Sequence, residues 1–269
     1  MTSRHVEPKI AARRVAVARD EGRRRLRALA ALCVMTLTAL AGIVVVNSPV
    51  LDVDEIVVRG ATNTTQADIA AASGILLGHP LLYVDVAGAE ERIGRLPWVE
   101  SVALARSAGG TLTVTVTERV ASAALPAVGG FALIDADARQ LAIVTDPPPG
   151  FLPVTGIIAD GIPGQPAPPE THSVLRLFSQ LTPEIAGQVT SVIWGEGALS
   201  VTLAGGGRAL LGDDTALEQK LLSLETVMAR VDLRCLAEID VRVPSAPAVT
   251  RMNANGDPRA PVVDLAECT

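Results

Sequence analysis

One stretch of the sequence constrains the chain more than any other: no charged residue occurs between Ala28 and Leu51. Its most apolar part runs from Ala28 to Val46. A helix rises about 1.5 Å per residue, so this part would have a length close to the thickness of a bilayer core, about 30 Å. We therefore predict a single transmembrane helix over residues 28–48.

A basic segment precedes this run. Residues 1–27 carry nine basic side chains against three acidic ones, although the whole chain has a net charge of −6. Such a segment stays in the cytoplasm by the positive-inside rule. We expect a basic cytoplasmic arm over residues 1–27, with the bulk of the chain on the other side of the cell membrane. A cleaved signal peptide and a nucleic-acid-binding arm are the alternatives.

The composition limits what the rest can be. Hydrophobic residues make up 49% and aromatic residues only 2%, so the core must be built from aliphatic side chains. Too few rings are present for a platform that stacks nucleic-acid bases, so we expect no nucleic-acid partner. Cys33 lies in the predicted span, while Cys235 and Cys268 would lie in an oxidising compartment, where a disulfide between them is left open.

The residues after Pro49 predict a small α+β domain. A strand is expected over 53–59, helices from Thr65 to Gly74 and from Asp85 to Pro97, and strands over 98–106 and 111–117. The last strand alternates strictly, with Leu112, Val114 and Val116 directed to a core. The order β-α-α-β-β is thereby predicted for residues 51–120.

Four segments of this domain resemble the POTRA domain of the FtsQ/DivIB family of bacterial cell-division proteins. They are IVVRG from Ile56, ILLGHPLLYVD from Ile75, LPWVESVALAR from Leu96 and TLTVTVTER from Thr111. The resemblance implies a divisome scaffold that binds FtsB and FtsL and, through them, other divisome proteins and the septal synthase. It places the protein at the division septum. Arg greatly outnumbers Lys, which is typical of high-GC genomes and favours an actinobacterial source.

Residues 121–251 predict a β-rich domain with a long C-terminal helix and an edge strand. A hairpin is expected at 131–144, a loop at 146–170, a short helix at 171–181 and strands at 189–194, 199–203 and 208–211. A capping box at 215–218 would start a helix with the buried stripe Leu217, Leu221, Leu224 and Met228. Residues 252–269 are expected to form a flexible tail.

The strand expected at 237–243 has Ile239, Val241 and Val243 directed inward. Prolines follow it at positions 244 and 247, which suits the edge of a sheet. The resemblance points to this region as the FtsB contact, and an edge can accept a strand of another chain. The candidate partner-binding residues are Arg242, Val243, Ser245, Ala246, Ala248 and Val249. The bland alternative is that the prolines only blunt the edge against aggregation.

No catalytic pattern occurs in the sequence. The three histidines have no nucleophile beside them, and no phosphate-cradling loop or metal-binding spacing is present. Asp213 and Asp214 directly precede a predicted helix, which favours helix capping over acid–base work. We expect no enzyme, no cofactor and no metal. A membrane-anchored extracytoplasmic cell-wall enzyme is the alternative, and a subunit of an outer-membrane transporter is a weaker one.

Overall fold

The computed structural model describes residues 27–43, 52–107, 109–233 and 236–251. Residues 27–43 form a helix whose side chains are all exposed. Within the described residues, no helix combines the length and the apolarity needed to cross a bilayer. The predicted cytoplasmic arm up to residue 26, the last five residues of the predicted span, the C-terminal tail and the pair Cys235–Cys268 lie outside the described residues.

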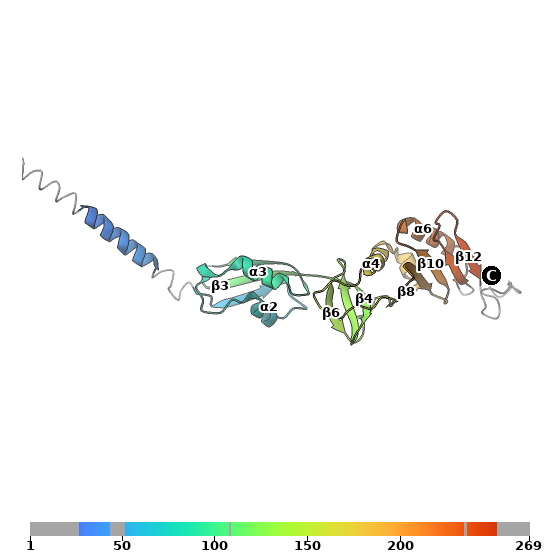
Figure 1. Cartoon of the computed structure of the whole chain (residues 1–269), viewed down its shortest axis with the longest axis horizontal. Coiled ribbons are helices and arrows are strands. Elements are labelled where there is room, and N and C mark those ends of the chain that lie inside the picture. The colour runs from blue at the N-terminus through green and yellow to red at the C-terminus, as the bar shows by residue number, and fades with distance from the viewer. Residues whose placement is uncertain (1–26, 44–51, 108, 234–235, 252–269) are drawn as a thin grey trace, which may run out of the picture.

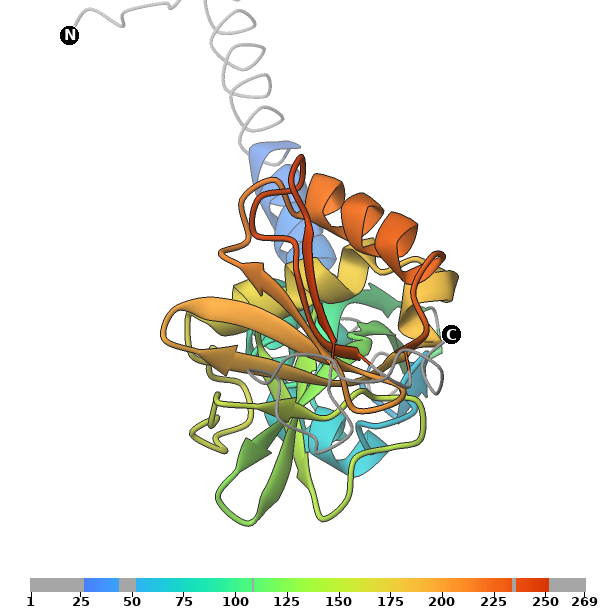
Figure 2. The same cartoon turned by 90° about the vertical axis from the view of Figure 1, so that its right-hand side faces the viewer.

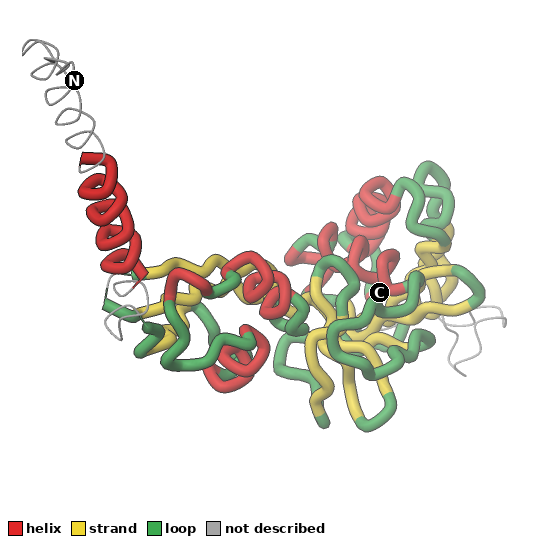
Figure 3. The backbone as a smooth tube through the Cα atoms, turned by 60° about the vertical axis from the view of Figure 1, so that its left-hand side comes forward, coloured by secondary structure: helices red, strands yellow, loops and turns green. Residues whose placement is uncertain are grey.

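Two folded domains follow the N-terminal helix, with the first lying between that helix and the second (Figures 1 and 3). We call residues 52–119 the first domain and residues 120–251 the second domain. The first domain contains β1 (Glu55–Arg59), α2 (Gln66–Ser73), the 3-10 turn η2 (Leu81–Tyr83), α3 (Val86–Gly94), β2 (Val99–Arg106) and β3 (Thr111–Glu118). Its sheet has the order β1-β3-β2, with β3 parallel to β1 and antiparallel to β2.

The helix caps, the helix stop and the strand alternation predicted for the first domain are all present in the structure. The Thr65 hydroxyl accepts a hydrogen bond from the backbone N–H of Asp68 and caps α2, which ends at Gly74 in the left-handed conformation. Asp85 caps α3 by accepting from the N–H of Gly88. The alternating residues of β3 (Leu112, Val114 and Val116) are buried beneath α2 and α3. The predicted order β-α-α-β-β is therefore confirmed, with η2 as an addition inside a segment expected to be loop.

The second domain contains two sheets and three helices within the described residues. The strands are β4 (Ala121–Ala127), β5 (Gly130–Asp135), β6 (Gln140–Val144), β7 (Val154–Thr155), β8 (Val189–Gly195), β9 (Ala198–Leu203), β10 (Arg208–Gly212), β11 (Leu236–Asp240) and β12 (Ala248–Arg251). The helices are α4 (Thr171–Gln180), α5 (Pro183–Ala186) and α6 (Leu217–Met228). One sheet has the order β4-β5-β6 and the other the order β12-β11-β10-β9-β8-β7.

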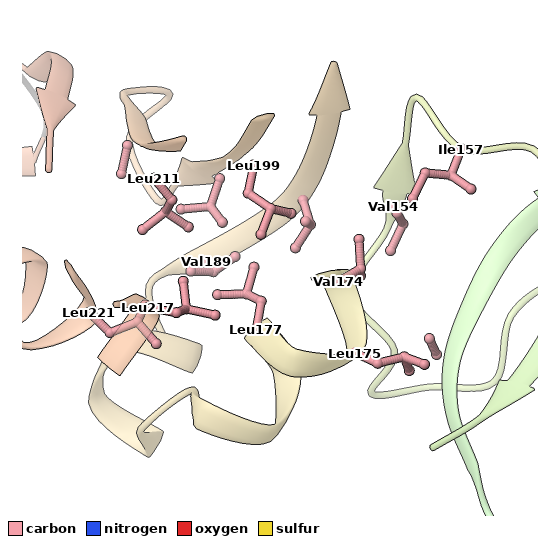
Figure 4. Close-up of a cluster of buried hydrophobic side chains, with 14 of the residues drawn as sticks. Val154, Ile157, Val174, Leu175, Leu177, Val189, Leu199, Leu211, Leu217 and Leu221 are labelled. Carbon is pink, nitrogen blue, oxygen red and sulfur yellow. The ribbon is translucent and has the colours of Figure 1, made fainter. Parts of the chain in front are cut away.

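The helices α4 and α6 cover one face of the six-stranded sheet (Figure 2). Their apolar stripes meet the inward residues of the strands in one core, of which Leu177, Leu199 and Leu211 are fully buried members (Figure 4). Leu217, Leu221 and Leu224 are buried there as the predicted stripe requires. This core fixes β10 and β11, and therefore positions the end of the sheet that β12 completes.

Several details of the second domain differ from the sequence-based prediction. The strand β4 was not predicted, because alanines and Pro126 give no clear hydrophobic alternation. The segment expected to be a long loop contributes β7, a two-residue strand. The predicted capping box at 215–218 is wrong: the helix begins one residue later after Ala216 in the left-handed conformation, and the Thr215 hydroxyl instead donates to the Asp213 carboxylate at 2.7 Å.

The two domains are joined by a short connection. Only two residues, Arg119 and Val120, separate β3 from β4. The preceding Glu118 carboxylate accepts hydrogen bonds from the backbone N–H groups of Asn63 (2.9 Å) and Thr64 (2.8 Å) in the first domain. These bonds lower the pKa of Glu118 even though burial opposes them by raising it.

Arg119 reaches into the second domain. Its guanidinium donates to the carboxylates of Asp135 at 2.7 Å and Asp137 at 3.0 Å, while Nε donates to the carbonyl of Val99 at 3.2 Å. The side chain of Trp98 also packs across the joint against a small buried cluster formed by Ala124, Leu133 and Leu141. Ion pairing and apolar packing therefore both hold the domains together.

Candidate partner-binding edge

The segment that holds the candidate partner-binding residues lies at one side of the six-stranded sheet, where β12 is the edge strand. β10 and β11 are parallel, and β12 pairs with β11 in the antiparallel sense, with Ile239 opposite Val249 and Asp240 opposite Ala248. The prediction that the strand over 237–243 leaves its outer backbone groups free is therefore wrong, because β12 occupies that side. The free edge lies one strand further out.

The structure gathers all six candidate residues in one exposed segment. Arg242, Val243, Ser245 and Ala246 lie in the connection between β11 and β12, while Ala248 and Val249 lie on β12 itself. Val243 is 58% exposed and does not point into the core as predicted. The alternation breaks there because β11 ends at Asp240 and the chain turns, closed by a hydrogen bond from the N–H of Ala246 to the carbonyl of Val243.

An ion pair fixes the start of this connection. The Arg242 guanidinium donates to the Asp240 carboxylate at 2.6 Å and 3.0 Å, and the Arg242 backbone N–H donates to the same carboxylate at 3.0 Å. The hydrogen bond from Arg242 is the main reason that the pKa of Asp240 lies below its ordinary value. Arg242 is thus already engaged within the chain, so its side chain orders the turn that leads to β12.

A groove of about 580 Å³ lies between this connection and the outer face of α6. On the connection side it is lined by Pro244, Ser245 and Pro247. On the helix side Leu222, which is exposed, and several polar residues line it. Sequence reasoning missed this face of α6 because it considered only the buried stripe. The signal was present, since Leu222 is an apolar residue that does not belong to that stripe.

The paired acids at the start of α6 are used for structure. The Asp213 carboxylate accepts a hydrogen bond from the Lys220 ammonium at 2.7 Å, and this bond is the main cause of the lowered pKa of Asp213. Asp214 accepts from Arg176 at 2.8 Å and from Ser173 at 3.0 Å. The expectation that both acids cap the helix is wrong, because each pairs with a cation and a hydroxyl instead. The described part of the chain has no group of three or more His, Cys, Asp or Glu side chains arranged to hold a metal ion.

Comparison with known proteins agrees with this architecture. Residues 51–119 match the family model of the FtsQ-type POTRA domain. The chain is 32% identical to cell division protein FtsQ of Mycobacteroides abscessus, over 64% of this chain and 54% of that protein. Identity to FtsQ of Corynebacterium glutamicum is 37%, over 46% of this chain and 55% of that protein. FtsQ of Streptomyces collinus is 28% identical over 86% of this chain and 90% of that protein.

The fold and these matches define a protein with an FtsQ-type POTRA domain followed by a β-rich region. Over most of its length the chain is similar to FtsQ cell-division proteins, and its first domain matches the FtsQ-type POTRA model, which confirms the resemblance found in the sequence. The matched part spans just over half the length of the first two relatives. All three relatives come from actinobacteria.

Proposed function

We propose that the protein is a membrane-anchored scaffold of the divisome that binds FtsB- and FtsL-like proteins at the division septum. In this role it links the early cytoplasmic division machinery to the synthesis of septal cell wall. The basic arm lies in the cytoplasm, one helix crosses the cell membrane, and both folded domains lie outside. The first domain serves as a docking and localisation module close to the membrane.

The N-terminal helix supports the membrane anchor. Its large apolar side chains are more than half exposed, and no charged residue occurs from Ala28 to Leu51. Such a helix has no protein surface to cover it within the described residues. Burial in lipid removes this apolar surface from water, which is the favourable term for a spanning helix.

The observation that carries the partner proposal is the outer edge of β12. The strand pairs with β11 on one side only, and its first three residues (Ala248, Val249 and Thr250) are exposed. An extended segment of another chain can add to such an edge through main-chain hydrogen bonds, with side-chain pockets providing specificity. The groove between α6 and the β11–β12 connection reaches Pro247, the residue directly before β12, and offers such a pocket.

A charge on this edge tests the proposal. Val249→Glu in the full chain is expected to weaken binding of a purified FtsB–FtsL complex by about 2 kcal/mol, or roughly 30-fold, as for a hot-spot residue. Glutamate at Val243 or Ala246 is expected to act in the same direction. Binding is measured with both membrane proteins in nanodiscs, and circular dichroism checks that each variant folds.

Thr155→Glu provides the matched control, because Thr155 is exposed on β7, the opposite edge of the same sheet. It should leave the affinity unchanged. Normal binding by folded Val249→Glu, or equal losses at the two edges, would place the contact elsewhere.

A further inference from the structure

Four large apolar side chains of the first domain lie together in sequence and are exposed. Leu76, Leu77, Leu82 and Tyr83 are between 59% and 69% exposed. They belong to the segment that leads from α2 through η2 towards α3. Scattered apolar residues on a surface are ordinary, but a concentration of this kind marks a contact site.

The segment is held in a defined shape. The N–H of Val53 donates to the carbonyl of His79 at 2.8 Å, and the N–H of Gly78 donates back to the carbonyl of Val53 at 2.9 Å. Leu81 and Val84 anchor the segment in the core of the first domain, since both are buried. The exposed side chains are therefore presented outward by a fixed backbone.

This segment lies at the end of the domain nearest the N-terminal helix (Figure 1). Asp52, the first described residue after that helix, pairs with Pro80 in an isolated β-bridge. If the span ends at residue 48, four Cα steps of at most about 3.5 Å bring the chain to Asp52, a reach of about 14 Å. The polar layer on each side of a bilayer is itself roughly 5–8 Å thick. The tether thus keeps the segment beside the lipid surface.

We propose that the segment from Leu76 to Tyr83, which we call the lipid-facing loop, docks on the outer surface of the membrane that anchors the chain. Leucine side chains enter the boundary between headgroups and acyl chains, and the tyrosine ring lies at the headgroup level, which aromatic residues favour. This inference rests on the membrane anchor proposed above. It adds a second contact that fixes how the first domain stands on the membrane.

The charges near the loop indicate which lipid property matters. Asp52, Asp54 and Asp85 are acidic. Two bases also lie near the loop, since Arg106 donates to the carbonyl of Val84 and Arg92 donates to the carbonyl of Ser73, so the balance stays acidic. An acidic balance gives no attraction to anionic headgroups. Docking therefore depends on the apolar side chains, and we expect it on zwitterionic phosphatidylcholine and little dependence on salt.

Depth-dependent fluorescence quenching tests the proposal on the full chain. The three native cysteines are replaced by serine, and a polarity-sensitive dye is attached to one new cysteine at a time in phosphatidylcholine vesicles. The lipids carry a nitroxide quencher either at the headgroup or deep in the acyl chain. The labelled positions are Leu82 in the loop, Leu37 in the N-terminal helix and Ser101, which is exposed on β2 towards the other end of the domain.

The three positions separate the two proposals. We expect the deep quencher to act at position 37, the headgroup quencher to act at position 82, and neither to act at position 101. Quenching at 37 together with no more quenching at 82 than at 101 would overturn the lipid-facing loop and leave the anchor intact. An unquenched label at 37 would overturn both.

A second variant guards against an effect of the dye. Leu76→Ser with Leu77→Ser should reduce quenching at position 82, because it removes apolar surface from the loop. Val128→Ser is the matched control, since Val128 is also apolar and exposed but lies in the turn between β4 and β5. Equal quenching in both variants would refute apolar docking.

Discussion

The joint between the two domains allows one substitution to be worked through in detail. In Arg119→Met the aliphatic stem stays and the guanidinium is lost. The Asp135 carboxylate, with a side chain only 4% exposed, then loses its cationic partner. Its other oxygen still accepts from the backbone N–H groups of Asp137 and Arg139, so the charge keeps part of its solvation.

The remaining hydrogen bonds to Asp135 limit the expected loss in the free energy of unfolding. Breaking a fully buried ion pair costs about 3–5 kcal/mol, and a hydrogen bond to a charged group contributes about 1.5–3 kcal/mol. Arg119 is itself 19% exposed, so we expect a loss of about 2 kcal/mol in the free energy of unfolding. The pair with Asp137 adds little, because that side chain is 80% exposed and a surface pair contributes less than about 1 kcal/mol.

The two tryptophans of the chain make the assay specific to the joint. Trp98 packs at the joint, whereas Trp194 packs on the core of the second domain. In a Trp194→Phe background, Trp98 emission during thermal unfolding in detergent reports the joint alone. Arg119→Met should lower the midpoint of this transition by roughly 4–8 °C for a chain of this size.

Two comparisons can refute the reasoning. Asp137→Asn should change the midpoint by at most about 2–4 °C and by less than Arg119→Met does, because it removes only the exposed pair. Asp135→Asn combined with Arg119→Met should cost less than the sum of the single changes, since the two groups interact directly. A negligible effect of Arg119→Met, or an equal effect of Asp137→Asn, would show that packing alone holds the domains.

Two further predictions concern Glu118 at the joint and the far end of the β4–β5 hairpin. Ionised Glu118 contributes to stability above the ordinary glutamate pKa, and this contribution is lost as the pH falls through the lowered pKa of Glu118. Glu118→Gln should remove the contribution. The stabilities of the two proteins, measured by unfolding between pH 3 and 7, should therefore converge at the acid end. Gly130→Ala should destabilise the β4–β5 hairpin by several kcal/mol, because its φ is positive and the new Cβ would lie 2.2 Å from the Val144 carbonyl oxygen. Gly129→Ala is the control, since a Cβ there meets open space. It should lower the free energy of unfolding, measured by thermal unfolding, by only about 1 kcal/mol.

The sequence predicted the first domain well because several independent signals agreed there. The caps at Thr65 and Asp85, the stop at Gly74 and the alternation of β3 are all local, and each is read within a few residues. β4 gave no such signal, since its position depends on pairing with β5 and on the apolar cluster that includes Trp98. Tertiary contacts, which no short window contains, decide such a strand.

The structure places the six candidate residues together but arranges them differently from the prediction, and their role in partner binding stays a prediction. The prolines at 244 and 247 favour the preceding strand as the sheet edge, but they belong to the connection to β12, so the edge lies one strand further out. The reversal at Val243 could not be foreseen, because the alternation of Ile239 and Val241 simply continues through it in the sequence. At this reversal the Arg242 guanidinium pairs with the Asp240 carboxylate, a contact between neighbours that periodicity does not register.

The parallel pairing of β1 with β3 has a mechanical consequence. The chain enters the first domain at the start of β1 and leaves it at the end of β3, and the two strands are neighbours in register from Glu55 with Thr111 to Arg59 with Thr115. Tension between a membrane anchor and a partner held at β12 would pull these strands past each other along their length. All the evenly spaced hydrogen bonds between them would then bear the load together instead of opening one at a time. Under such tension the parallel pairing would resist unravelling of the domain.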